Sequence, residues 1–224
     1  MPITKILLVE DHPVFSKGLA SLIEAQPTYK VVGEARDCKE AIEAITQTEP
    51  DILVLDLNLK GENGLELIHD LQALRPGLPI LVLSMYEERY YAERVLRAGA
   101  RGYIMKAEAG DTILEAIRTV LAGKIWLSEA EKARLSEYLT HPIHMNESND
   151  KFASLSRLSN RELEIFTLIG KGFGTIEISR RLNISTKTID THKEHLKEKL
   201  HCKNSQELRQ LAIEWLSFSA YSET

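Results

Sequence analysis

The sequence predicts an α/β domain built on a doubly wound, five-stranded parallel sheet, followed by an all-α domain that contains a helix-turn-helix. Three observations support this prediction. Short apolar runs alternate with helical patterns over residues 1–123, polar residues with reactive side chains follow several of these runs, and residues 155–224 show helical patterns only. Alternating strands and helices of this length indicate βαβ crossovers, and hence a parallel sheet covered on both faces.

Each strand is predicted from an apolar run that is too short for a helix. The runs are rich in aliphatic and β-branched residues, as is typical of strands buried on both faces. In chain order they are Ile6–Val9, Val31–Ala35, Ile52–Leu55, Ile80–Leu83 and Gly102–Met105. Apolar residues at helical spacing lie between successive runs, and a further helix over Ile113–Leu121 follows the fifth.

The pattern changes after residue 123. A short connecting helix is predicted over Ser128–Leu139, and His141–Asp150 lacks any apolar period, which is typical of a linker. We therefore expect a first domain over residues 1–123, a linker over 124–154 and a second domain over 155–224. Charge supports this division, because residues 1–130 carry a net charge of −6 and residues 151–224 carry +3.

The second domain is predicted to be helical throughout. Ser159 and Glu162 form a capping box at the start of a helix that buries Leu163 and Phe166. The following helices are expected over Thr175–Leu182, over Thr186–Leu200 with Ser185 as its cap, and from Asn204 or Ser205 to about Phe218. Two short helices joined by a turn describe a helix-turn-helix.

Composition indicates a soluble, cytoplasmic protein. Hydrophobic residues make up 43% and charged residues 27% of the chain, which is ordinary for a globular domain. The start of the chain passes into an apolar run that soon meets acidic residues, unlike a signal peptide or a transmembrane span, so we expect no membrane partner. Cys38 and Cys202 have no metal-ligand spacing and are interpreted as reduced thiols.

Carboxylates are expected to gather at one edge of the sheet. Asp56 closes the third apolar run, and Glu10 and Asp11 follow the first. The carboxyl ends of parallel strands meet at the edge where open α/β sheets keep their ligand sites. Three like charges this close destabilise one another unless a cation lies between them, and an all-oxygen site suits Mg²⁺.

A hydroxyl and an ammonium group are expected at the same edge. Ser84 follows the fourth apolar run and Lys106 follows the fifth. A carboxylate nucleophile, a metal ion, a hydroxyl and an ammonium are together what the formation of an aspartyl phosphate requires.

With Gly64, these residues resemble the flavodoxin-like receiver domain of two-component response regulators, over roughly residues 4–123. The resemblance implies that Asp56 accepts a phosphoryl group from a sensor histidine kinase. It also implies that Mg²⁺ is held by Glu10, Asp11, Asp56 and the backbone carbonyl of Asn58.

The same resemblance assigns roles to three residues on the last two strands. Ser84 would move to bind one phosphoryl oxygen, and Lys106 would pair with another. Tyr103 matches the aromatic switch position, and its ring would turn inward as Ser84 moves.

Residues 155–216 resemble the LuxR-type DNA-binding domain of the NarL/FixJ regulators. The matching residues are Leu158–Glu162, Gly172, Glu177–Ile178, Leu182–Ser185, Thr188–Ile189, Thr191–His192 and Lys199–Leu200. The resemblance implies that the helix from Thr186 is the recognition helix. It implies as partners double-stranded DNA with two half-sites and, after phosphorylation, a second copy of the chain.

Side chains on two helices are the candidates for these contacts. Lysines suit phosphate groups, and threonines suit base edges. The expected DNA contacts are Lys187, Thr188, Thr191, Lys193 and Lys197. Dimer contacts are expected from Leu208, Leu211 and Trp215, although an apolar stripe at helical spacing equally completes a domain's own core.

Together these features predict a phosphorylation-controlled transcriptional regulator, and not an enzyme beyond slow self-dephosphorylation. Two alternatives remain. Haloacid-dehalogenase phosphatases also combine an aspartate nucleophile with Mg²⁺, but they carry a second carboxylate where this chain has Asn58. A phosphorylation-independent regulator, or an interaction module that binds DNA weakly, is compatible with the acidic Asp190 and Glu194 on the recognition helix.

Overall fold

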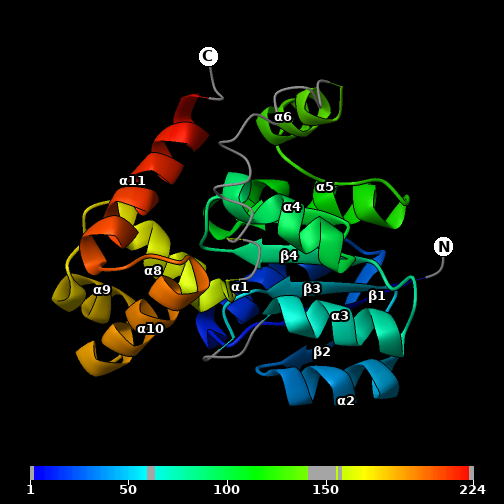
Figure 1. Ribbon diagram of the computed structural model, residues 1–224. Helices are drawn as coiled ribbons and strands as arrows, with labels where there is room; N and C mark the ends of the chain where they lie inside the picture. The colour runs from blue at the N-terminus through cyan, green and yellow to red at the C-terminus, as the bar shows by residue number, and fades with distance from the viewer. Residues whose placement is uncertain (1–2, 60–63, 141–154, 156–157, 222–224) are drawn as a thin grey trace. The chain divides into compact units, whose positions relative to one another are not determined.

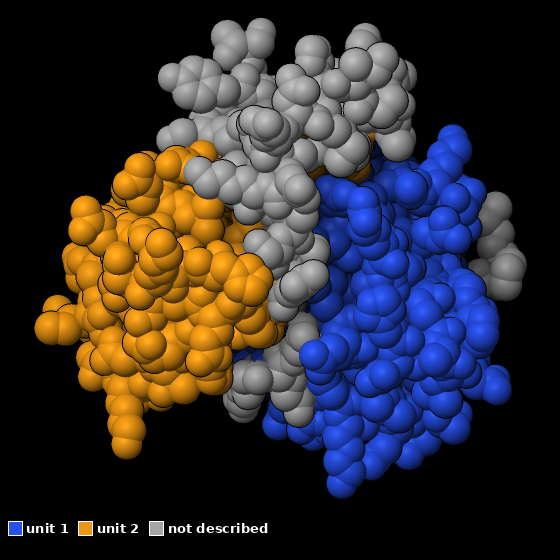
Figure 2. All heavy atoms as spheres, in the orientation of Figure 1, with its two compact units in different colours: residues 1–133 blue, residues 134–224 orange. Residues whose placement is uncertain are grey.

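The computed structural model describes residues 3–59, 64–140, 155 and 158–221. The chain forms two compact units, residues 1–133 and residues 134–224, which Figure 2 distinguishes by colour. The predicted linker stretch His141–Asp150 and the neighbouring residues up to 154 lie outside the described residues. We describe each unit by itself.

The first unit is the predicted doubly wound sheet. Its five parallel strands follow the order β2-β1-β3-β4-β5, as Figure 1 shows. The strands are β1 (Thr4–Val9), β2 (Tyr29–Ala35), β3 (Ile52–Asp56), β4 (Ile80–Ser84) and β5 (Gly102–Met105). The helices are α1 (Pro13–Glu24), α2 (Cys38–Thr48), α3 (Gly64–Leu74), α4 (Glu88–Ala98) and α5 (Ala109–Leu121), with a short 3-10 turn η1 (Lys106–Glu108) before α5.

The core of this unit has two layers because side chains alternate along each strand. On one face, Ile6, Val54 and Leu83 join a cluster with apolar residues of α1 and α5. The intervening strand residues, such as Leu7, Leu53 and Val82, are equally buried and point to the opposite face. This arrangement confirms the expectation of burial on both faces for β3 and β4, whereas the edge strand β2 is only partly buried.

The segment after α5 belongs to this unit, although its sequence favours a linker. The amide of Trp126 donates to the carbonyl of Arg101 at 3.0 Å, and the amide of Tyr103 donates to the carbonyl of Trp126 at 3.0 Å. Leu127 is buried. The segment therefore extends the hydrogen bonding along the outer edge of β5, which would otherwise be unpaired. The helix α6 (Glu129–Thr140) follows within one residue of its predicted start.

The second unit is helical, as predicted. Its helices are α8 (Asn160–Gly170), α9 (Thr175–Leu182), α10 (Thr186–Lys199) and α11 (Ser205–Tyr221). Ser159 and Glu162 form the predicted capping box, and the hydroxyl of Ser185 accepts a hydrogen bond from the amide of Thr188 to cap α10. Asn183 turns the chain between α9 and α10 with a left-handed φ of 51°.

The helix α11 packs against α8 and supplies part of the domain's core. Leu208 and Leu211 are 1% and 9% exposed, so in this structure both side chains pack into the domain's own core, which is the alternative to the predicted dimer contact. Their apolar stripe is covered by the unit's own helices. Trp215 is half-buried, and its ring lies 5.5 Å from that of the fully buried Phe166. Gly170 permits this packing, because a Cβ there would lie 2.7 Å from the carbonyl oxygen of Ala212.

None of the described helices combines the length and the apolar character that a membrane-spanning segment requires.

Candidate functional site

Side chains of opposite charge meet at the carboxyl ends of β1, β3 and β5. Because β1 and β3 are adjacent, Glu10 and Asp56 meet at the carboxyl edge of the sheet. Lys106 enters from the end of β5, and its Nζ lies 2.7 Å from Asp56 Oδ2 and 2.6 Å from Glu10 Oε2. The contact with Asp56 is a hydrogen bond, whereas that with Glu10 is an ion pair without hydrogen-bond geometry. All three side chains are buried.

Two neighbouring residues complete this edge. Asp11 lies beside Glu10, and its Oδ1 is buried without a hydrogen-bond partner among the described residues. The ring of His12 lies over both carboxylates, with Nδ1 3.0 Å from Glu10 Oε1 and 2.8 Å from Asp11 Oδ1. Ligand atoms of Glu10, Asp11, His12 and Asp56 all lie within 4.8 Å of one another. The structure thus brings together the carboxylates that the sequence placed at one edge.

The environment of Asp56 suits a reactive carboxylate. Burial raises its pKa, and the positive charge of Lys106 and the amide of Asn58, which donates to Oδ1 at 2.9 Å, act in the opposite direction. The net effect is a raised pKa, and the direct ion pair with Lys106 favours the anion against this burial. The peptide of Asn58 is held against Asp56 by this hydrogen bond. Gly64, the first residue of α3, lies so close to this strand end that a Cβ there would be 2.8 Å from the backbone of Leu57.

Ser84 and Tyr103 are connected through the loop after β4. Ser84 is fully buried, and its hydroxyl accepts a hydrogen bond from the amide of Tyr86 at 3.1 Å. The hydroxyl of Tyr103 donates to the carbonyl of Tyr86 at 2.9 Å. Tyr103 is only 1% exposed, and burial raises its pKa well above the ordinary value, so the hydroxyl remains a donor. Its ring is therefore already in the inward position in this structure.

The second candidate surface is the outer side of α10. Ile189 and Leu196 are fully buried and Leu200 nearly so, which confirms the predicted inner side of this helix. Lys187, Thr188 and Thr191 are exposed.

Two of the residues expected to contact DNA already interact with neighbouring side chains. Lys193 donates to the hydroxyl of Thr175 in α9 at 2.5 Å, and Lys197 pairs with Glu194 at 2.8 Å. Lys187 differs from these two lysines. Its side chain is exposed and makes no hydrogen bond or ion pair within the part of the chain that the structure describes, so it is available for a phosphate contact.

Matches to two protein families identify the family of this chain. Residues 6–118 match the response regulator receiver domain, and residues 156–212 match the bacterial regulatory proteins of the luxR family. The chain belongs to the response regulators with a LuxR-type DNA-binding domain. The five-stranded sheet and the helical unit described above correspond to these two matches.

Similar proteins support this assignment for the response regulator. The oxygen regulatory protein NreC of Staphylococcus carnosus is 36% identical over 212 residues, which cover 93% of this chain and 96% of that protein. The RcsB response regulator of Salmonella typhimurium is 27% identical, with a TM-score of 0.57 and coverage of 97% and 99%. RcsB from Salmonella enterica serovar Typhimurium, bound to a promoter in the presence of the phosphomimetic BeF₃⁻, is 28% identical, with a TM-score of 0.56 and coverage of 93% and 97%.

Sequence reasoning missed two neighbours of the acidic cluster in this regulator. His12 directly follows Glu10 and Asp11, and this adjacency was the available signal. Phe15 lies in α1, and Lys106 Nζ lies 4.8 Å from the centre of its ring. No local pattern predicts that contact, because the two residues are far apart in the sequence and meet only when α1 and α5 pack together on one face of the sheet.

The capping box of α8 makes the stability of the second unit sensitive to pH. Burial alone would raise the pKa of Glu162, but hydrogen bonds from Lys199 Nζ at 2.7 Å and the amide of Ser159 at 2.8 Å outweigh it and lower the pKa. A lowered pKa means that this stabilisation is present above the ordinary value of 4.5 and is lost as pH falls through the folded-state value.

We expect Glu162→Gln to lower the free energy of unfolding of the second unit at neutral pH and to make it depend less on pH. Hydrogen bonds to charged groups contribute roughly 1.5–3 kcal/mol, and we expect the lower end because Lys199 is partly exposed to water. The free energy of unfolding of the second unit is measured in urea, with Trp215 fluorescence as the signal in a Trp126→Phe background. The exposed Glu198→Gln serves as control, and equal pH profiles of the two variants would contradict the assignment.

Proposed function

We propose that this response regulator is phosphorylated on Asp56 by a sensor histidine kinase and thereby controls its own binding to DNA. The observation that carries the proposal is the buried Asp56 carboxylate, held 2.7 Å from Lys106 at the carboxyl edge of the sheet. Nucleophilic attack by this carboxylate oxygen on a phosphoryl group forms the aspartyl phosphate. The leaving histidine takes the bonding electron pair. We propose no other catalytic activity beyond slow self-dephosphorylation.

The residues at this edge fit a divalent cation. Asp11 has a buried carboxylate oxygen without a hydrogen-bond partner among the described residues, and the carboxylates of Glu10, Asp11 and Asp56 lie close together with the imidazole of His12. We propose that Glu10, Asp11, Asp56 and the carbonyl of Asn58 hold Mg²⁺. When bound, Mg²⁺ supplies neutralisation of the phosphoryl oxygens. Lys106 pairs with a further phosphoryl oxygen after releasing its contact with Asp56.

The response to phosphorylation would pass through Ser84 and Tyr103. A phosphoryl oxygen on Asp56 offers the Ser84 hydroxyl a charged acceptor, which is a stronger partner than a neutral one. Reorientation of Ser84 toward it would break the hydrogen bond from the Tyr86 amide. Because Tyr86 also accepts from the Tyr103 hydroxyl, the loop after β4 responds as a unit. The resulting population shift alters the face made by α4 and β5.

We propose that α10 enters the major groove of double-stranded DNA with two half-sites. Lys187 and Lys197 suit phosphates, and Thr188, Thr191 and Lys193 suit base edges. Ile213, 44% exposed on α11, offers an apolar contact for a homodimer beside the half-buried Trp215. A cytoplasmic location fits these partners.

Selection from random-sequence DNA tests the whole proposal. The full-length protein is incubated with and without a small-molecule phosphodonor and Mg²⁺, and bound DNA is sequenced. Enrichment of a two-half-site motif only with phosphodonor is expected. Equal enrichment in both arms would exclude phosphorylation as the switch. No enrichment, with Asp56 shown to be phosphorylated, would favour a protein partner for the helical unit.

A salt titration tests the role of Lys187. Each phosphate contact contributes about 0.9 to the slope of log affinity against log salt, because counterions are released on binding. We expect Lys187→Ala to lower that slope by about this amount and to weaken binding similarly for all sequences. Fluorescence anisotropy with specific and unrelated duplexes measures it. An unchanged slope, as expected for the exposed Lys17→Ala control in α1, would exclude the contact.

A further inference from the structure

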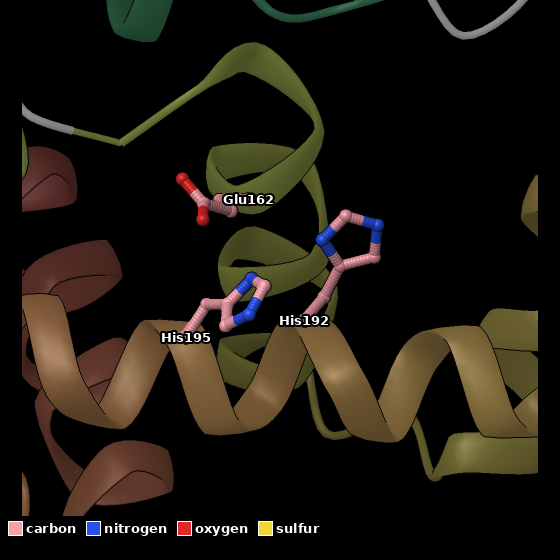
Figure 3. A group of neighbouring side chains, drawn as sticks. All are labelled: Glu162, His192 and His195. Carbon is pink, nitrogen blue, oxygen red and sulfur yellow. The ribbon is translucent and has the colours of Figure 1, made fainter.

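Three side chains that the proposed function does not use converge between α8 and α10. Glu162 lies in the first turn of α8, and His192 and His195 lie on α10. One potential ligand atom of each residue lies within 4.8 Å of the other two. Figure 3 shows the carboxylate and both imidazole rings in the space between the two helices. The two histidines share a helix face because they are three residues apart.

The two imidazoles differ in their exposure. His192 Nδ1 is buried and makes no hydrogen bond to any described residue, whereas the His195 side chain is exposed and leaves a path from solvent. Buried polar atoms nearly always have a partner, so His192 Nδ1 requires an explanation. Burial lowers the pKa of His192, and the nearby Arg161, His195 and Lys199 act in the same direction against Glu162.

Two positive charges near the cluster oppose the entry of a cation, but both are already matched. Arg161 pairs with Glu164 at 2.7 Å. Lys199 and the amide of Ser159 both donate to Oε2 of Glu162. The other carboxylate oxygen, Oε1, makes no hydrogen bond among the described residues. The cluster therefore offers a carboxylate and two imidazole rings to a ligand, in surroundings that are close to neutral.

We propose that Glu162, His192 and His195 bind a divalent transition-metal ion of the zinc type, with water completing the coordination. Two imidazole nitrogens and one carboxylate oxygen form a ligand set that suits Zn²⁺ and discriminates against Mg²⁺ and Ca²⁺, which prefer oxygen. Bonds of about 2.0–2.2 Å are reached by rotation of the side chains, because α8 and α10 already pack together. The bound ion cross-links α10 to α8.

The experiment is a zinc titration of the full-length protein in competition with a chromophoric chelator. Millimolar Mg²⁺ is present throughout to occupy the oxygen ligands of the first unit. We expect one zinc ion to bind, and Co²⁺ to give the visible absorption of a tetrahedral nitrogen-and-oxygen site. Zinc should also raise the urea midpoint of the second unit, followed by Trp215 in the Trp126→Phe background, because a ligand of the native state stabilises it.

Two matched histidine variants locate the ion. His195→Asn removes an exposed ligand without disturbing the core, and we expect it to weaken zinc binding at least about 10-fold, since even outer-shell partners of a metal contribute that much. His12→Asn removes the imidazole beside Glu10 and Asp11 and should leave the affinity unchanged. Unaltered zinc binding by His195→Asn would overturn the proposal. So would loss of zinc binding in His12→Asn, because the ion would then belong to the first unit.

Discussion

Replacing Asp56 by asparagine is expected to abolish the increase in DNA affinity that a phosphodonor produces. The substituted amide side chain keeps the size of the original but offers no carboxylate oxygen for phosphoryl transfer. Coupling between two sites of a protein is typically worth about 5- to 150-fold in affinity, and we expect the variant to lose all of this increase. Anisotropy of a labelled operator from the selection, with and without phosphodonor and Mg²⁺, measures the change.

Asp70→Asn is the matched control for this experiment. Asp70 lies on the exposed side of α3, away from the carboxyl edge of the sheet, so this variant should respond like the wild type. Full affinity of the Asp56→Asn variant without phosphodonor, equal to that of the phosphorylated wild type, would show that Asp56 phosphorylation is not the switch.

Replacing Lys106 by methionine is expected to destabilise the first unit by about 3 kcal/mol or more at neutral pH. Lys106 neutralises Glu10 and Asp56, and all three side chains are buried. Removal of one partner of a buried ion pair leaves an uncompensated charge, which typically costs about 3–5 kcal/mol. Urea unfolding followed by Trp126 fluorescence in a Trp215→Phe background measures the loss.

The same charges predict how pH and Mg²⁺ change the stability of the Lys106→Met variant. Burial already raises the pKa of Asp56, and loss of Lys106 raises it further. Protonation then stabilises the folded variant, so its deficit should shrink as pH falls and grow as pH rises through that pKa. Millimolar Mg²⁺ should restore part of the stability by taking the place of the ammonium group between the carboxylates. The exposed Lys17→Met is the control, and an equal effect of both substitutions would contradict the account.

Local patterns were enough to predict the helices, the strands and the reactive groups of the first unit. A short run rich in aliphatic and β-branched residues favours a strand of a covered sheet, and each of the five runs lies in a strand. Asp56, Glu10 and Lys106 follow such runs, so parallel pairing alone brings them to one edge. The capping box of Ser159 and Glu162 was equally readable, because it depends on residues only three positions apart.

The packing of the elements establishes what covers each apolar face and which charged groups are paired. Periodicity identified the apolar stripe of α11, but the packing of α8 against it places Leu208 and Leu211 in the core. Periodicity also does not predict the hydrogen bond of Lys193 to Thr175 on another helix. Nor does it predict the pairing of Trp126 with the edge of β5. The meeting of Glu162 with His192 and His195 also depends on how α8 and α10 pack. Contacts between residues distant in sequence arise from packing, which a local pattern does not encode.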